Sequence, residues 1–256
     1  MKADNFTLES YFRRIGYVGP VAADIVTLST IMKCQLYSVP FENLDIQAGK
    51  TVSFEPEHIV SKILDRERGG YCYEVNGLFA MALEAMGVPY RFAGARPMFL
   101  DTRRPRTHMV ILAYVEDEQW LFDLGFGNYG IRAPINLNNL DVDQVQDFDT
   151  FRLIRGDSEE YALKARVEGE WVSQYSFDLS HQEWIDFMPV NYLNSTHPDA
   201  IFVRKLLIVL HDPKGRNILI GDTLKTIQAG SITKKHVASE DVAKVLVDVF
   251  GLTLPI

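Results

Sequence analysis

The stretch RERGGYCYEVNGLFAMALEAMG, residues 66–87, places one of the chain's two cysteines directly after a pair of glycines. Behind Cys72, apolar residues recur at helical spacing, which predicts a helix that ends near Gly87 and Pro89. The pattern therefore predicts a flexible glycine turn that delivers a cysteine to the first turn of a helix. Unpaired backbone N–H groups and the positive end of the helix dipole would stabilise a thiolate there.

Composition is that of an ordinary globular protein. The 256 residues suffice for a sizeable core, and the net charge of -8 disfavours general attraction to nucleic acid or to an anionic membrane. The first 17 residues lack the apolar run of a signal peptide, and no stretch approaches the roughly 20 apolar residues of a membrane span. Cys34 and Cys72 could form a disulfide, but we expect a reducing cytoplasmic location. With six scattered histidines and no CxxC motif, we expect no metal site.

Three regions of the chain differ in pattern. Helical signals fill residues 1–87, including a helix predicted from Pro20 to just before Pro40. Residues 88–187 read as short strands and turns, which favours an antiparallel barrel or sandwich. Residues 188–256 mix both signals, and the predicted class is α+β.

The last region begins with polar residues and ends with a helical pattern. We expect a loop at 189–200, strands within 203–210 and 217–227, and a helix over 239–250 with Ser239 as its N-cap.

A nucleophilic thiolate needs an imidazole partner, and the imidazole needs an orienting acid. His108 opens one predicted strand and Asp123 lies in the next. If Glu116 and Asp117 are the two turn residues, His108 pairs with Gly125 and lies diagonally across from Asp123 on the same face. A slip of one residue would put the two on opposite faces. Local sequence does not fix the register.

Each of these features has a structural explanation when taken alone. A cysteine near a helix start is most often a small buried hydrophobe, and a histidine at a strand end is usually solvated. Asp123 between Phe122 and Leu124 is less expected, because a strand core rarely holds an unpaired acid. GFGNYG, residues 125–130, fits a dinucleotide-binding pattern, but no helix signal follows it, which argues against that class.

Several segments together resemble the signature blocks of the arylamine N-acetyltransferases. They are RGGYCYEVNGLF (68–79), VPFENLD (39–45), THMVIL (107–112) and FDLGFG (122–127), with the weaker blocks YFRRIGY (11–17) and NYLNSTHPDAIF (191–202). The resemblance implies an N-terminal helical bundle over 1–87, a central β-barrel over 88–187 and a smaller α/β lid over 188–256.

The resemblance also implies roles for individual residues. Cys72 would be the acetyl-carrying nucleophile, His108 its partner and Asp123 the orienting acid, with no metal. Substrate contacts would come from Phe41 and Phe126 in the acceptor pocket, and from Thr107, Gly127 and a loop at 194–196 beside the thiol arm of coenzyme A. Gln35 stands where bacterial members often have a histidine, and we attach no catalytic role to it.

The implied reaction is ping-pong transfer of an acetyl group from acetyl-coenzyme A to an arylamine or arylhydrazine. The basic cluster Arg103, Arg104 and Arg106 is a candidate for the nucleotide end of coenzyme A, although such a run is more often simply solvated. We also hypothesise a buried ion pair between Arg68 and Glu42 that fixes the cysteine loop.

Two alternatives stay open. A cysteine hydrolase or transglutaminase-like enzyme shares the order Cys, His, Asp but would need an open groove for peptide or glutamine substrates. A non-catalytic relative that binds acyl carriers would have no use for an activated thiol.

Overall fold

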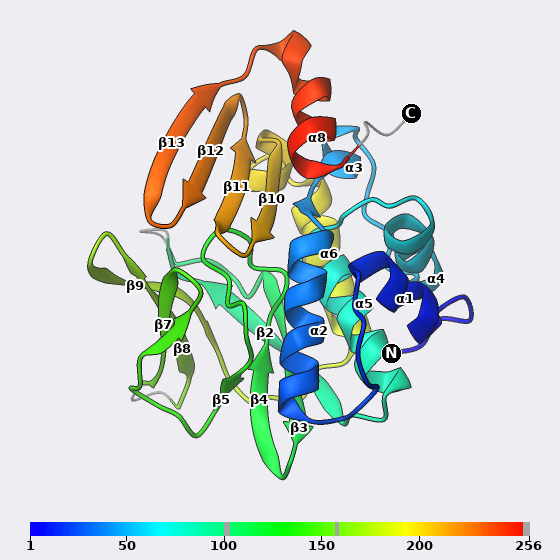
Figure 1. The fold of residues 1–256 in the computed structure, drawn as a ribbon, viewed down its shortest axis with the longest axis vertical. Coiled ribbons are helices and arrows are strands. Elements are labelled where there is room, and N and C mark those ends of the chain that lie inside the picture. Colours follow the sequence, from blue (N-terminus) through cyan, green and yellow to red (C-terminus); the bar gives the residue numbers. More distant parts are fainter. Residues whose placement is uncertain (100–102, 157–158, 253–256) are drawn as a thin grey trace.

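The computed structural model describes residues 1–99, 103–156 and 159–252 (Figure 1). Helices of the first third lie together on one side, a barrel-like sheet lies beside them, and a second sheet with a C-terminal helix lies above both. The mixed α+β class with a helical bundle, a barrel and a smaller C-terminal part is confirmed. No helix in the described ranges is both long enough and apolar enough to cross a bilayer.

The first third is helical, as expected. Its elements are α1 Leu8–Ile15, α2 Ile25–Ser38, α3 Leu44–Gln47, α4 Pro56–Val60, the π-helical turn η1 Ser61–Asp65 and α5 Cys72–Ala85. The prediction that the second helix starts at Pro20 is wrong. It begins at Ile25, because the carboxylate of Asp24 accepts the backbone N–H of Thr27 at 2.8 Å and caps the helix there.

The second region forms an eight-stranded antiparallel sheet in the order β5-β4-β3-β2-β9-β8-β7-β6. Its strands are β2 Tyr90–Pro97, β3 His108–Val115, β4 Glu118–Phe122, β5 Ile135–Asn136, β6 Gln144–Gln146, β7 Asp149–Arg155, β8 Tyr161–Val167 and β9 Glu170–Phe177. The edge strand β6 is linked to the segment just before the other edge strand, β5, because Gln146 accepts from the backbone N–H of Arg132 (2.7 Å) and donates to the carbonyl of Ala133 (2.9 Å). The sheet is therefore nearly closed into a barrel.

The C-terminal sheet has the order β1-β10-β11-β12-β13 and is antiparallel. Its strands are β1 Phe41–Glu42, β10 Leu207–Asp212, β11 Gly215–Ile220, β12 Thr223–Gln228 and β13 Ser231–His236. Strand β1 comes from the helical region, so the first and last parts of the chain share one sheet. The boundaries proposed at 87/88 and 187/188 stay predictions.

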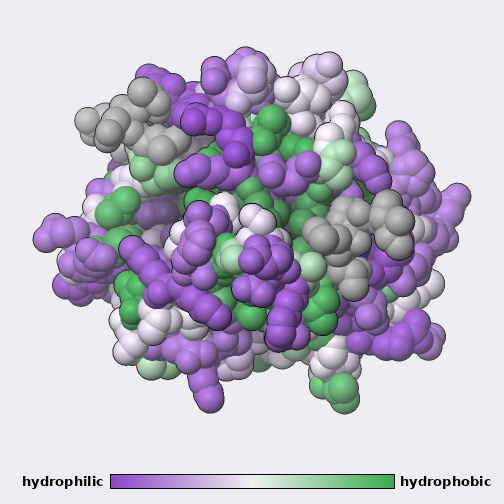
Figure 2. All heavy atoms as spheres, turned by 90° about the horizontal axis from the view of Figure 1, so that it is seen from above, coloured by the Kyte–Doolittle hydropathy of each residue, from purple (hydrophilic) through white to green (hydrophobic). Residues whose placement is uncertain are grey.

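Short helices complete the last third: η2 Trp184–Phe187, α6 Met188–Thr196, α7 Ile201–Arg204, η3 Ser239–Asp241 and α8 Val242–Phe250. Helix α8 packs on one face of the C-terminal sheet through a small cluster that includes Leu219, Leu246 and Phe250. The opposite face joins the main core that links the helices to the barrel. Seen from above, this end of the molecule is mainly hydrophilic, with hydrophobic atoms visible between the hydrophilic ones (Figure 2).

Several expectations for the last third were wrong. Residues 188–196 are helical rather than a loop, because Pro189 suits the first turn of a helix, where a missing N–H costs nothing. The strand expected within 203–210 starts only at Leu207, since α7 precedes it, and the strand expected within 217–227 is two strands with a turn between them. Ser239 is not an N-cap, because it lies inside the turn η3.

Candidate active site

The glycine pair before Cys72 lies against the segment that contains β1. The backbone N–H of Glu42 donates to the carbonyl of Gly70 (3.0 Å), and Gly70 donates to the carbonyl of Pro40 (3.2 Å). A Cβ atom on Gly69 would lie 2.0 Å from that carbonyl oxygen. The glycines therefore allow two backbone segments to approach closely, rather than providing a flexible turn as the sequence suggested.

Cys72 is the first residue of α5, as predicted, and only 2% of its surface is exposed. Burial, and then the negative charge of Asp123, raise the pKa of the Cys72 thiol well above its ordinary range. The backbone N–H groups of Cys72 and Tyr73 lower it, but by less. Burial therefore opposes the stabilisation of a thiolate that the helix N-terminus was expected to provide.

The β3–β4 hairpin meets the condition that the sequence left open. Glu116 and Asp117 form the turn with φ of 54° and 63°, which is typical of a two-residue type I′ hairpin. Ile111 pairs with Phe122, and the same register continued along the strands sets His108 opposite Gly125. The histidine and the aspartate therefore share a face.

Asp123 is fully buried and receives three hydrogen bonds. His108 Nε2 donates to Oδ2 (2.8 Å), while the backbone N–H of Gly125 (2.9 Å) and Nδ2 of Asn76 (3.2 Å) donate to Oδ1. The strand that was expected to contain Asp123 ends at Phe122, so Asp123 lies just beyond it. Three donors compensate the burial of this carboxylate.

Gly125 connects this carboxylate to the cysteine. A Cβ atom on Gly125 would lie 2.6 Å from the Cα atom of Cys72 and 3.0 Å from its Cβ atom. Only glycine fits between the loop after β4 and the first turn of α5. The structure thus brings Cys72, His108 and Asp123 into one neighbourhood.

Aromatic rings surround the imidazole. The ring of Phe126 lies 5.2 Å from that of His108, 4.9 Å from that of Tyr175 and 5.9 Å from that of the half-exposed Phe99. Tyr175 lies 5.3 Å from His108 and is fully buried. Burial and the charge of Asp123 raise the pKa of Tyr175 far above its usual range. Sequence reasoning missed Tyr175, whose only signal was its position in an alternating strand.

The other predicted substrate residues lie around this neighbourhood. The ring of Phe41 is 6.0 Å from that of Phe202, which lies 5.4 Å from that of Tyr71, the neighbour of Cys72. The carbonyl of Thr107 accepts from Tyr73 Oη (2.9 Å) and from Asn194 Nδ2 (3.2 Å). Asn194 belongs to α6, so the predicted loop at 194–196 is the last turn of a helix.

Gly127 joins the loop that follows Asp123 to the C-terminal sheet. Its φ of 86° is left-handed, and its carbonyl lies 3.1 Å from Nε2 of His211 in β10. Burial, followed by the charges of Arg132 and Arg216, lowers the pKa of His211 far below its usual range. A neutral His211 therefore donates its Nε2–H to the Gly127 carbonyl.

The hypothesised ion pair is present and belongs to a larger network. Arg68 donates to Glu42 Oε1 from Nη2 (2.7 Å) and Nε (3.0 Å). Lys62, which the sequence reasoning missed, lies 2.8 Å from Glu74 and 2.6 Å from Asp45. Burial lowers the pKa of Lys62, but these carboxylates outweigh it and raise the pKa overall. Glu74 in turn accepts the backbone N–H of Tyr71 (3.0 Å), which fastens the network to the start of α5.

The predicted arginine cluster divides in the structure. Arg106 forms ion pairs with Asp178 (2.5 Å) and Glu160 (3.2 Å). The hydrogen bond to Asp178 is the largest cause of the raised pKa of Arg106. Arg103 and Arg104 are exposed. Of the three, Arg106 is therefore the least suited to bind a phosphate.

A second basic surface lies on the C-terminal sheet. Cross-strand pairing forms a row that runs Phe41, Val209, Ile218, Lys225, Lys234. At about 4.8 Å per strand the row spans about 19 Å. Its outer end opens into a cavity of about 740 Å³ that Arg204 and Lys205 also line. Burial, and then the charges of Arg216 and Lys234, lower the pKa of Lys225, as expected where cations gather.

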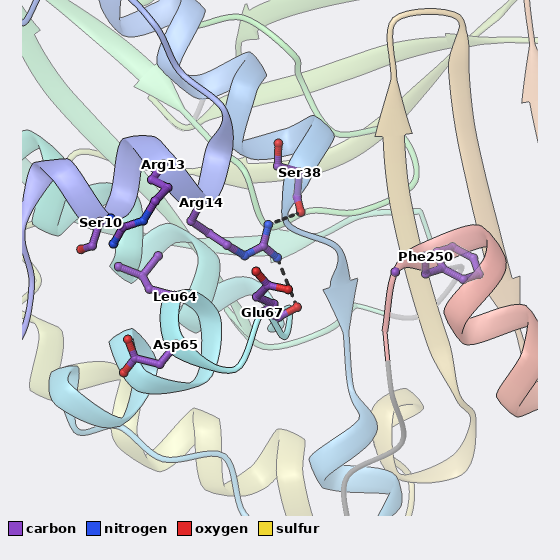
Figure 3. A pocket seen from close by; sticks show the side chains of 9 residues that line it. Ser10, Arg13, Arg14, Ser38, Leu64, Asp65, Glu67 and Phe250 are labelled. Carbon is purple, nitrogen blue, oxygen red and sulfur yellow. Dashed lines mark hydrogen bonds between the residues drawn. The ribbon is translucent and has the colours of Figure 1, made fainter.

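A further cavity lies between the N-terminal helices and the end of α8 (Figure 3). It has about 340 Å³ and is lined by Ser10, Arg13, Arg14, Ser38, Leu64, Asp65, Glu67, Phe250 and Gly251. Arg14 donates to the carbonyls of Ile63 (2.9 Å), Ser38 (2.7 Å) and Glu67 (3.3 Å). These bonds hold the segment that leads to Cys72, and the cavity contains none of the predicted site residues.

Comparison with known proteins decides the family. A family model described as N-acetyltransferase matches residues 24–256. The chain is 34% identical over 257 residues to an arylamine N-acetyltransferase of Mycolicibacterium smegmatis. This alignment covers 96% of this chain and 92% of that protein. The chain belongs to the arylamine N-acetyltransferase family. The resemblance inferred from the signature blocks is confirmed.

Other arylamine N-acetyltransferases agree in sequence and fold. The Escherichia coli protein is 31% identical over 215 residues, covering 83% of this chain and 76% of its own length. A solved structure of the Mycobacterium marinum arylamine N-acetyltransferase in complex with CoA matches with a TM-score of 0.90 at 29% identity, over 96% of this chain and 92% of that one.

Proposed function

We propose that this protein is an acyltransferase that moves the acetyl group of acetyl-coenzyme A to the nitrogen of an arylamine or arylhydrazine. The observation that carries the proposal is the buried His108–Asp123 hydrogen bond beside a cysteine at a helix N-terminus, in a member of this family. The named activity and the CoA complex of its relatives support the choice of substrates.

In the proposed first half-reaction, His108 takes the thiol proton of Cys72. Because His108 Nε2 is bonded to Asp123, Nδ1 is the nitrogen that exchanges this proton. The thiolate attacks the thioester carbonyl, and backbone N–H groups at the start of α5 stabilise the oxyanion. The carbon–sulfur bond to coenzyme A then breaks, and its thiol leaves with the proton from His108.

In the second half-reaction, the aromatic amine attacks the acetyl-cysteine carbonyl. His108 accepts a proton from the amine nitrogen, the bond to the Cys72 sulfur breaks, and the N-acetylated product leaves. The flat rings of Phe126, Tyr175 and Phe41 suit an aromatic acceptor. Asp123 orients the imidazole and stabilises its charged form without taking up a proton.

We also propose that the basic row on the C-terminal sheet holds the nucleotide end of coenzyme A. At one end of the row, Phe41 packs near Phe202, which in turn packs near Tyr71, the neighbour of Cys72. At the other end, Lys225 and Lys234 would supply positive charge to the phosphates. Arg103 and Arg104 remain the alternative that the sequence suggested.

A cysteine hydrolase acting on peptides is the competing function. The small exposed fraction of Cys72, 2%, argues against it, because a peptide substrate needs an open groove.

Two free cysteines, one of them the proposed nucleophile, suit the reducing cytoplasm, which we propose as the location.

Incubation with acetyl-coenzyme A and no acceptor tests the mechanism directly. Mass spectrometry should find one added acetyl group on Cys72, and addition of an arylamine should remove it. Cys72→Ala should abolish the adduct, whereas Cys34→Ala, which changes the other free cysteine, should keep it. A folded, active protein without the adduct would overturn the ping-pong mechanism.

A further inference from the structure

Asn76 lies one helical turn after Cys72 and is completely buried. Its Nδ2 donates to the carbonyl of Met109 (2.8 Å) and to Oδ1 of Asp123 (3.2 Å). Its Oδ1 accepts the backbone N–H of Leu124 (2.8 Å). One amide thus contacts the strand that carries His108, the carboxylate that orients His108, and the loop that follows.

The orientation of this amide is fixed by its neighbours. A flipped amide would set its oxygen against the Met109 carbonyl and the Asp123 carboxylate, and its N–H₂ group against the Leu124 N–H. Because Asn76 is 0% exposed, no bulk water can replace these bonds if they are lost.

We propose that Asn76 is a positioning residue for the acetyl-transfer reaction, which ties the helix of the nucleophile to the acid that orients the histidine. Helix α5 and the β3–β4 hairpin are separate elements, and their relative position sets the distance between thiol and imidazole. This inference rests on the proposed function.

The positioning role has a chemical consequence. His108 is bonded to Asp123, and in the proposed mechanism it takes the proton of the Cys72 thiol, whose ionisation burial opposes. If Asn76 fixes Asp123 relative to α5, its loss weakens the thiolate–imidazolium pair. The fraction of thiolate at neutral pH should then fall, before any substrate is bound.

Asn76→Ala tests this in a Cys34→Ala background, where iodoacetamide can react only with Cys72. We expect the alkylation rate at pH 7 and kcat to fall by about ten- to a hundredfold, the effect of losing a hydrogen bond to a charged group. The pH profile of alkylation should move to higher pH, while the KM for acetyl-coenzyme A stays within about twofold.

Gln35→Ala is the matched control. Gln35 is also a buried amide bonded to α5, because its Nε2 donates to the carbonyl of Val75 (2.8 Å). Its Oε1 accepts from Tyr11 Oη (2.6 Å), and within the described residues it has no bond to His108 or Asp123. This variant should lose thermal stability and keep the alkylation profile of the parent. If Gln35→Ala moves the profile as far as Asn76→Ala, general loosening of α5 explains both and the inference is wrong.

Asn76→Asp provides a second variant of nearly the same shape. The introduced carboxyl keeps an acceptor for the Leu124 N–H but, once ionised, cannot donate to Asp123 and repels it. The alkylation profile should again move to higher pH. A parental profile in both Asn76 variants would overturn the inference, and because alkylation needs no acetyl-coenzyme A, this result is distinct from failure of the proposed function.

Discussion

Nε2 of His108 donates to Oδ2 of Asp123 at 2.8 Å, although the two residues are 15 positions apart and Asp123 is fully buried. The type I′ turn at Glu116 and Asp117 sets the register that brings them onto one face. The pair therefore depends on local turn geometry, while its third partner, Cys72, comes from a different element.

Asp123→Asn should preserve the shape of the site but lose the negative charge that holds the imidazolium. We expect kcat to fall by about 10³–10⁴-fold, as in other enzymes where the orienting acid of a triad becomes an amide. Steady-state acetylation of an arylamine measures this. Asp143→Asn, which alters only a surface ion pair with Arg152, is the control and should be fully active. Activity within tenfold of the parent would rule out the orienting role.

His108→Gln should raise the pH at which Cys72 reacts. Burial and the charge of Asp123 raise the thiol pKa, so without the imidazolium the reactive thiolate should form only above the usual thiol pKa of about 8.5. Alkylation by iodoacetamide in a Cys34→Ala background should be slow at pH 7 and rise with pH, whereas the parent reacts at neutral pH. Equal profiles would contradict the ion pair.

The raised pKa of the Cys72 thiol should also make the free energy of unfolding depend on pH. In His108→Gln the native state keeps the thiol protonated while the unfolded chain ionises above about pH 8.5, so the unfolded state binds fewer protons and stability falls as pH rises through that value. Below it, this contribution is constant. Denaturant titrations at several pH values measure the slope.

Arg68→Ala should lower thermal stability as well as activity. It leaves the buried carboxylate of Glu42 without its strongest partner, which costs about 3–5 kcal/mol in comparable cases. Calorimetry and an acetylation assay on the same sample test both effects. Arg152→Ala, on the surface, should cost less than about 1 kcal/mol. Lost activity at unchanged stability would count against a structural role for the ion pair.

The double variant Lys225→Ala, Lys234→Ala should raise the KM for acetyl-coenzyme A severalfold, and this effect should shrink at high salt. The KM for acetyl-pantetheine, which lacks the nucleotide, should not change. Arg103→Ala with Arg104→Ala is the matched pair from the other basic surface. If only the arginine double variant raises the KM for acetyl-coenzyme A, Arg103 and Arg104 hold the nucleotide end and the proposal for the basic row is wrong.

The signature blocks around Cys72, His108 and Asp123 contained enough information to identify the family and the three parts of the fold. They did so because each block carries strong local constraints, such as the Gly69–Gly70 pair or the two-residue turn. Errors came where local signals were weak. The sequence predicts a loop at Pro189, which lies in the first turn of α6, and an N-cap at Ser239, which lies inside the turn η3.

By itself, the sequence determined the element that carries the cysteine and the hairpin that carries the histidine, but it left the register of that hairpin open. These are properties of neighbouring residues, set by periodicity and turn geometry. Only the tertiary structure decided that Asn76 reaches Asp123, that Lys62 joins the network of Arg68, and that burial opposes ionisation of Cys72. Those facts arise from packing between distant segments, and the loss of water around a charge has no signature in the local chain.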